Sequence, residues 1–284
     1  MPLFIMVSGY LCGIGRRAAD LAGYGAVIKK RAYSYLVPFF FWIVLQHPLH
    51  PLANIWETLF GLDKGLWFLM TLFLLNFMTY TAQLAGARAG RFQKQVFWAV
   101  YLGQCAFVVL ETLLGWEFLS PGLTRLYLPF YLLGYLAGEY KRQISEIPVI
   151  AKKLLFAVSM AGFLALVVFC DLQDVGSLML LLRQLLASVL GCCVVVYGMS
   201  FIRDGRAKRF LAWLGGYTLE IYVLHFHFAT ILNRGIAYEL YSWQGAVFVT
   251  SSFAAMSLIT AVIIAVTKKI PLLNFLLYGK RILS

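Results

Sequence analysis

Long hydrophobic runs separated by short polar segments cover most of the chain. Eight runs carry little or no charge, at residues 32–50, 65–87, 95–113, 121–138, 154–170, 177–202, 210–233 and 243–267. Each is close to the roughly 20 residues that an α-helix needs to cross a bilayer. A shorter apolar run opens the chain and reaches Gly13 before the first charge at Arg16. The pattern predicts an all-α, polytopic transmembrane helix bundle of eight full helices and a short N-terminal stub.

Composition supports this class. Hydrophobic residues make up 62% of the 284 residues and charged residues only 13%, against about 25% charged in soluble domains. No long polar insert divides the chain, so we expect one membrane-embedded domain over residues 1–284. The five cysteines lie in or at the ends of apolar runs without CxxC spacing, which favours packing over a disulfide framework or a zinc site.

A net charge of +12 would suggest nucleic acid in a soluble protein, but here the basic residues alternate between loops. Only Lys64 is basic in the loop between the first two long runs. Most basic residues fall in every second loop and in the tail: Arg16, Arg17, Lys29, Lys30, Arg31; Arg88, Arg91, Lys94; Lys141, Arg142, Lys152, Lys153; Arg203, Arg206, Lys208, Arg209; and Lys268, Lys269, Lys280, Arg281. The positive-inside rule places these segments and the C-terminus in the cytoplasm. We therefore expect a lipid bilayer as partner and no nucleic acid.

The same rule puts Met1 on the outer side, although no spanning helix precedes it in the chain. Two explanations are open. The short stub inserts unaided, or a helix that normally precedes it is missing. We favour the second, because a run of roughly 13 residues is too short to cross alone and has no basic segment ahead of it to act as a signal.

Five stretches, in order, resemble the integral membrane acyltransferase type 3 family. They are MPLFIMVSGYLCG from Met1, KKRAYSYLVPFFFW from Lys29, GLWFLMTLF from Gly65, LPFYLLGYLAG from Leu128 and LGGYTLEIYVLHFHF from Leu214. The resemblance implies a bundle of ten helices, and the predicted stub and eight helices correspond to ten minus the first. That first helix normally carries a basic residue followed ten residues later by a His, a pattern that this chain does not show. The resemblance therefore also implies a truncated and inactive form as one reading of the chain.

The family resemblance implies transfer of an acyl group, commonly acetyl, from cytoplasmic acyl-CoA to a hydroxyl of a cell-envelope or exopolysaccharide sugar. It implies a multi-pass protein of the bacterial inner membrane, with acyl-CoA as donor substrate, no bound cofactor, and a carbohydrate or lipid-linked sugar as acceptor. A polysaccharide transporter or export partner, or a non-catalytic remnant, are the alternatives, because a bundle with a polar interior would also serve transport.

Acyl transfer to a hydroxyl needs a base with a pKa near neutrality and a polar site within the membrane. Glu220, His225 and His227 occur together in the run 210–233, near the expected middle of the membrane. We expect His225, Glu220, Tyr222 and Trp67 to form the catalytic site, and the family resemblance favours His225 and Tyr222 as its inward face. A histidine that only bonds a neighbouring helix is the alternative. Possible ionic partners of Glu220, toward the outer side, are Arg125, Arg183 and Arg234, with Glu111 nearby.

Other candidates flank the helices. Lys29, Lys30 and Arg31 would bind the phosphates of acyl-CoA, although the positive-inside bias alone also explains them. The family resemblance adds Ser8 to the donor site and gives Trp67 a role in stacking or gating a sugar, where an interfacial anchor is the alternative. His47 and His50 are only two ligands, so we expect no metal site.

Overall fold

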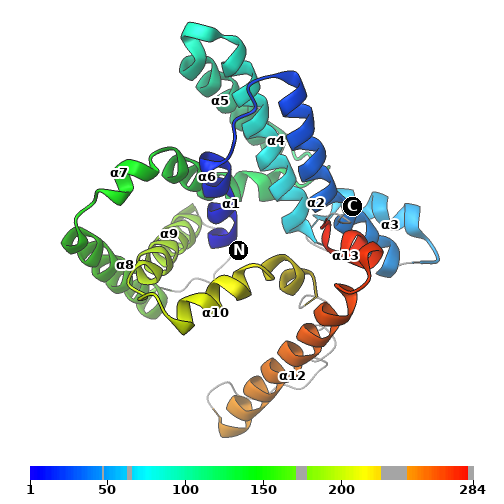
Figure 1. Ribbon diagram of the computed structural model, residues 1–284, viewed down its shortest axis with the longest axis vertical. Coiled ribbons are helices and arrows are strands. Elements are labelled where there is room, and N and C mark those ends of the chain that lie inside the picture. Colours follow the sequence, from blue (N-terminus) through cyan, green and yellow to red (C-terminus); the bar gives the residue numbers. More distant parts are fainter. Residues whose placement is uncertain (47, 63–65, 171–177, 225–241, 281–284) are drawn as a thin grey trace. The chain divides into compact units, whose positions relative to one another are not determined.

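A computed structural model describes residues 1–46, 48–62, 66–170, 178–224 and 242–280 (Figure 1). Within these ranges the regular secondary structure consists of helices, without a strand. The predicted all-α class is therefore confirmed. Contacts divide the chain into two compact units, which are described separately below. Our assignment of the whole chain to one domain stays a prediction.

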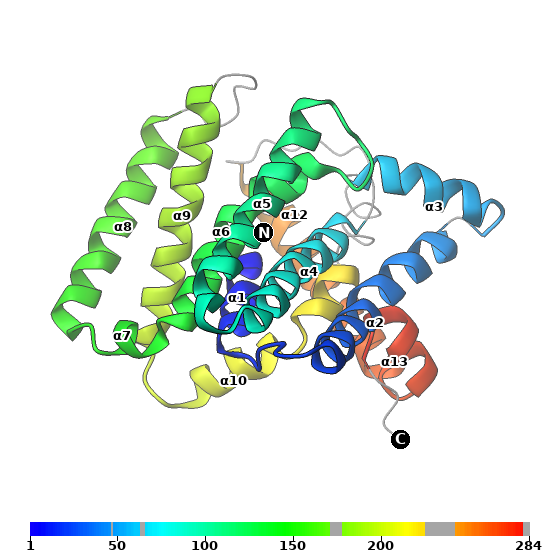
Figure 2. The same ribbon diagram turned by 90° about the horizontal axis from the view of Figure 1, so that it is seen from above.

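The first unit comprises Met1–Tyr24, Leu74–Trp116 and Pro121–Lys208. Its helices are α1 (Pro2–Ile14), most of α4 (Trp67–Arg88), α5 (Gln93–Leu113), α6 (Pro121–Glu139), the short α7 (Lys141–Ser145), α8 (Val149–Phe169) and α9 (Leu178–Ser200). The 3₁₀ turn η2 (Gly90–Phe92) leads into α5. Figure 1 and Figure 2 show α1 lying along α6, and α8 lying along α9.

Glycines allow α1 and α6 to approach closely. A Cβ built on Gly134 of α6 would lie 1.8 Å from the carbonyl oxygen of Met6, and one built on Gly9 of α1 would lie 2.1 Å from that of Tyr131. Gly13 and Gly138 repeat the arrangement one turn further along. Small residues at such spacing let helix backbones touch. In a membrane the hydrophobic effect does not drive helices together, so close packing of this kind is a main source of helix association.

The second unit comprises Gly25–Phe73, Glu117–Ser120 and Arg209–Ser284. It contains most of α2 (Leu21–Gln46), α3 (Pro51–Phe60), the start of α4 (Trp67–Arg88), most of α10 (Arg206–Gly215), α12 (Trp243–Thr267) and α13 (Pro271–Tyr278). The helices α2 and α4 run from one unit into the other along the chain. Within the second unit α13 packs on α2, where the Trp42 indole donates a hydrogen bond of 3.2 Å to the Leu277 carbonyl.

Five helices in the described part are long and apolar enough to cross a membrane: Trp67–Arg88, Gly90–Leu113 (η2 and α5 together), Val149–Phe169, Leu181–Ser200 and Trp243–Thr267. They match five of the eight predicted runs. The run 121–138 also corresponds to a helix, α6, and the apolar stub corresponds to α1.

Two predicted boundaries were wrong. The run 32–50 belongs to a helix that begins at Leu21, so Lys29, Lys30 and Arg31 lie within α2 and not in a loop before it. The run 210–233 is not continuous: α10 ends at Gly215, a turn follows, and residues 218–224 are helical again. Two successive glycines, Gly215 and Gly216, explain the break, because glycine is among the weakest helix formers.

We predict that Gly134→Val will separate α1 from α6 and destabilise the protein by more than about 3 kcal/mol, because the new side chain meets backbone that has no room to move. The measurement is the melting temperature of the purified protein in detergent, followed by size-exclusion chromatography. Gly103→Val is the matched control, because a Cβ at Gly103 of α5 meets nothing within 4 Å. Equal melting temperatures for the two variants would show that the glycine contact does not hold this pair.

Candidate functional site

A buried carboxylate lies just after the turn at Gly216 that separates α10 from the next helical residues. Tyr217 starts the next turn of helix, and its carbonyl accepts the Ile221 amide at 2.9 Å. This puts Glu220 in the first turn of the helical residues 218–224, where its side chain is fully buried. A charged group at such a position needs partners, since desolvation of an unpaired carboxylate is very costly.

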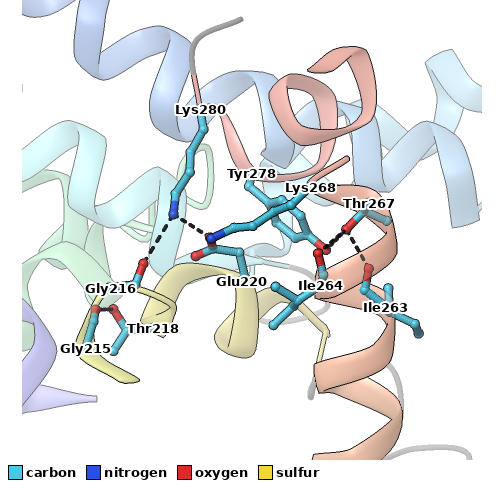
Figure 3. Close-up of polar contacts among 10 residues, drawn as sticks. All are labelled: Gly215, Gly216, Thr218, Glu220, Ile263, Ile264, Thr267, Lys268, Tyr278 and Lys280. Atoms are coloured by element: carbon cyan, nitrogen blue, oxygen red, sulfur yellow. Dashed lines mark hydrogen bonds and ion pairs between the residues drawn. The ribbon is translucent and has the colours of Figure 1, made fainter. Parts of the chain in front are cut away.

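Two lysines from the C-terminal part of the chain supply those partners (Figure 3). Lys280 forms an ion pair with Glu220 Oε1, and the Lys268 ammonium lies 3.2 Å from the same oxygen. Lys280 also donates to the Gly216 carbonyl at 3.2 Å. Glu220 Oε2 has no hydrogen-bond partner among the described residues. We call Glu220, Lys268 and Lys280 the carboxylate–lysine cluster.

An aromatic ring completes the surroundings of the two ammonium groups. Lys268 lies over the face of Tyr217, 3.6 Å from its centroid, and Lys280 lies 5.9 Å from the same centroid. The negative face of the ring attracts both cations. Tyr217 and Glu220 together therefore offset the repulsion between two neighbouring positive charges.

Contacts between the ends of α12 and α13 hold the backbone from which the side chains of Lys268 and Lys280 extend. The Tyr278 and Thr267 hydroxyls are 3.0 Å apart, and Thr267 also donates to the Ile263 carbonyl at 2.7 Å (Figure 3). Burial, with a smaller contribution from the charge of Glu220, raises the pKa of Tyr278, so this hydroxyl stays protonated at neutral pH. The bond joins the end of α12, next to Lys268, to the end of α13, two residues before Lys280.

Gly279 anchors these helix ends to α2. It has a φ of 63°, and a Cβ there would lie 2.5 Å from the Ser34 carbonyl oxygen. Only glycine accepts both the left-handed backbone and the close approach. Because Lys280 follows Gly279, and Lys30 and Arg31 precede Ser34 by about one helical turn, the second unit gathers basic residues of α2 near the carboxylate–lysine cluster.

The three predicted donor-binding residues on α2 have different surroundings. Arg31 is half-buried and donates to the Tyr35 hydroxyl at 3.2 Å. The Lys29 ammonium lies 5.9 Å from the Tyr33 centroid, and Lys30 is exposed. The fourth predicted donor-site residue, Ser8, lies half-buried in α1 of the first unit.

The rings of both aromatic candidates, Trp67 and Tyr222, lie near Phe68, a residue that the sequence analysis did not name. Phe68 of α4 lies 4.9 Å from the ring of Tyr222 and 6.2 Å from that of Trp67, centroid to centroid. Tyr222 is buried and Trp67 half-buried. Tyr222 is two positions after Glu220, roughly 200° around a helix, so the aromatic group and the carboxylate occupy opposite sides of the helical residues 218–224.

The ion pairs that Glu220 makes in the described part of the chain come from residues that the sequence analysis did not name as its partners. Arg125 and Arg183 are exposed on α6 and α9 of the first unit, whereas the ion pairs of Glu220 come from Lys268 and Lys280. His225, His227, Arg234 and His47 lie outside the described residues. Among the described residues no three His, Cys, Asp or Glu side chains gather as metal ligands would.

We predict that Glu220→Gln lowers the stability of the protein by about 1–3 kcal/mol, because two lysines lose their shared counter-ion while both keep some contact with water. The measurement is the thermal unfolding midpoint in detergent. Glu146→Gln is the matched control, since Glu146 forms an exposed pair with Arg142 at 3.4 Å. A midpoint for Glu220→Gln no lower than that of Glu146→Gln would mean that the carboxylate–lysine cluster does not stabilise the fold.

Comparison with known proteins adds one decisive match. The family model Acyl_transf_3, described as an acyltransferase domain, matches residues 1–266, which is nearly the whole chain. No curated protein and no solved structure matches the chain. The family match agrees with the order of motifs in the sequence and with the helices long enough to cross a membrane. The chain is therefore a membrane protein of the acyltransferase type 3 family.

Proposed function

We propose that the protein transfers an acyl group, most simply acetyl, from acyl-CoA at the cytoplasmic face to a hydroxyl of a cell-envelope sugar. The family match supports the class of reaction, acyl transfer. The gathering of basic residues around one end of the second unit is the structural observation that supports an acyl-CoA donor. A multi-pass location in the bacterial inner membrane, with the C-terminus in the cytoplasm, belongs to the same proposal.

The reaction itself balances without a further reactant. The sugar oxygen attacks the carbonyl carbon of the thioester, a C–O bond forms, and the C–S bond breaks. The proton of the hydroxyl passes to a base and then to the departing thiolate, giving an ester and free coenzyme A. His225 remains our prediction for that base, because a histidine titrates near neutral pH.

The donor is a polyanion, and the second unit offers it cations. Lys29, Lys30 and Arg31 on α2 accompany Lys268 and Lys280, and within this set only Glu220 is negative. The set therefore retains an excess of positive charge after its ion pairs are counted. Charge-assisted hydrogen bonds from lysine and arginine are the usual means of holding phosphates.

Glu220 has a different role in this scheme from the catalytic one suggested by the sequence. Its carboxylate forms ion pairs with Lys268 and Lys280 and so holds both side chains in place. Glu220 is therefore a positioning residue in our proposal. Trp67 and Tyr222, joined through Phe68, offer an aromatic surface on which a sugar ring could stack, and Ser8 remains a predicted donor contact.

The proposal is tested with membranes that contain the protein and acetyl-CoA labelled in the acetyl group. Transfer of label to a glycan, absent from membranes without the protein, supports the acyltransferase. Export of the glycan without label would favour a transporter, and absence of both label transfer and export would contradict the proposal.

We predict that Arg31→Gln raises the KM for acetyl-CoA by about tenfold with a smaller change in kcat, because it removes a charge-assisted contact made to the donor before reaction. Initial rates at varied acetyl-CoA concentration measure this. Arg142→Gln, an exposed arginine that the charge rule places on the same side, is the control and should keep the original KM. An equal KM for both variants would remove Arg31 from the donor site.

A further inference from the structure

A polar cleft in the first unit is lined by residues that have no part in the site proposed above. It has a volume of about 380 Å³, within the usual range for small-molecule sites, and is bounded by the ends of α4 and α6, the start of α5 and the segment after α1. Its charged lining residues are Arg17, Lys94 and Glu139. Arg17 pairs with Glu139, while Lys94 has no ion-pair partner within the described residues. The charge rule places all the loops at this cleft on the cytoplasmic side.

The wall of the cleft is aromatic. Phe97 of α5 stacks on Tyr135 of α6, with centroids 5.6 Å apart and planes at 19°. Trp98 stands edge-on to Phe97 at 5.2 Å. Flat rings that support one another in this way are rigid, so the wall keeps its shape without a ligand.

The inner end of the cleft holds an amide that lacks a hydrogen-bond acceptor. Gln83 of α4 is only 5% exposed; its Oε1 accepts the Ala18 amide at 3.2 Å, but its Nε2 has no partner among the described residues. Buried polar groups are nearly always paired, so an unpaired one at the end of a cleft indicates a missing ligand or water.

Two further buried groups without partners lie one turn deeper. Tyr131 precedes Tyr135 by four residues on α6, and Tyr101 follows Phe97 by four residues on α5. Residues four apart share a helix face, so each helix continues its cleft-lining face inward. Both tyrosines are almost fully buried, and neither hydroxyl has a partner in the described part of the chain. Phe97 also stacks on Tyr101, with planes at 12°, which links the cleft wall to this deeper layer.

We infer that this cleft binds the phosphopantetheine arm of the acyl-CoA donor, with the adjoining phosphates at Arg17 and Lys94; this rests on the proposed function. The arm is a thin chain with two amides and a hydroxyl, and one of its amide oxygens can accept a hydrogen bond from Gln83 Nε2 at the cleft wall. The cations stand at the mouth, where the phosphates that begin the arm would lie.

The test measures binding and needs no turnover. Coenzyme A and dephospho-coenzyme A, which keeps the diphosphate and the arm, are titrated by calorimetry into the full chain in lipid nanodiscs. We expect Lys94→Gln to weaken binding of both probes by about three- to tenfold, and Gln83→Leu by about tenfold. The matched controls are Lys153→Gln and Gln95→Leu, exposed residues outside the cleft, which should change binding less than twofold.

Lys94 is exposed, so Lys94→Gln keeps the fold. If Gln83→Leu does not fold, the affinity of Lys94→Gln alone tests the assignment of the cleft. Unchanged affinity for both probes in Lys94→Gln would overturn the assignment of the cleft. If the cleft variants lose affinity but membranes with the protein transfer no acyl label, the cleft stands and the proposed function fails. If label transfer occurs and the cleft variants keep the original affinities, the function stands and the cleft assignment fails.

Discussion

A fully buried carboxylate must be compensated by positive charge, and in this chain Glu220 determines how the end of the second unit is built. The cost of burying an isolated ionised carboxylate far exceeds the few kcal/mol by which proteins are stable. Two lysines at the ends of successive helices, α12 and α13, meet that requirement. The Thr267–Tyr278 contact, the left-handed Gly279 and the Trp42–Leu277 hydrogen bond then place those helix ends against each other and against α2.

The first unit follows another physical rule. In α1 and α6 the backbones touch through glycines, and α5 adds stacked aromatic rings to the same unit. This leaves polar groups of α4, α5 and α6 in the interior of the unit, where they pair incompletely. In a family whose reaction needs an acyl donor, incomplete pairing beside an open cleft is a reason to look for the donor there.

Much of the helical architecture could be predicted from the sequence, because a run of apolar residues long enough to cross a membrane has few other stable structures. The boundaries were less certain. The break at Gly215 and Gly216 could have been read from the two glycines, but the apolar residues around them dominated the pattern. The start of α2 at Leu21 was missed because Lys29, Lys30 and Arg31 are good helix formers that also mark membrane boundaries.

The candidate site was only partly predictable. Glu220 was identified because a carboxylate is rare in an apolar run, but its partners were not, since Lys268 and Lys280 are 48 and 60 residues further along the chain and served equally well as topology signals. Tertiary contacts of that separation leave no local pattern. The cleft beside Gln83 was missed for the same reason: its charged residues come from the segment after α1, the start of α5 and the end of α6, and each alone looks like an ordinary membrane boundary.

The most direct test of the account is a double-mutant cycle between Glu220 and Lys280, with thermal unfolding of Glu220→Gln, Lys280→Gln and the double variant. If Glu220 and Lys280 interact, the two losses of unfolding free energy will not add. The loss in the double variant will be smaller than the sum of the two single losses by about 1 kcal/mol or more. Additive losses would show that the two groups act independently and would contradict the central role given to the buried carboxylate.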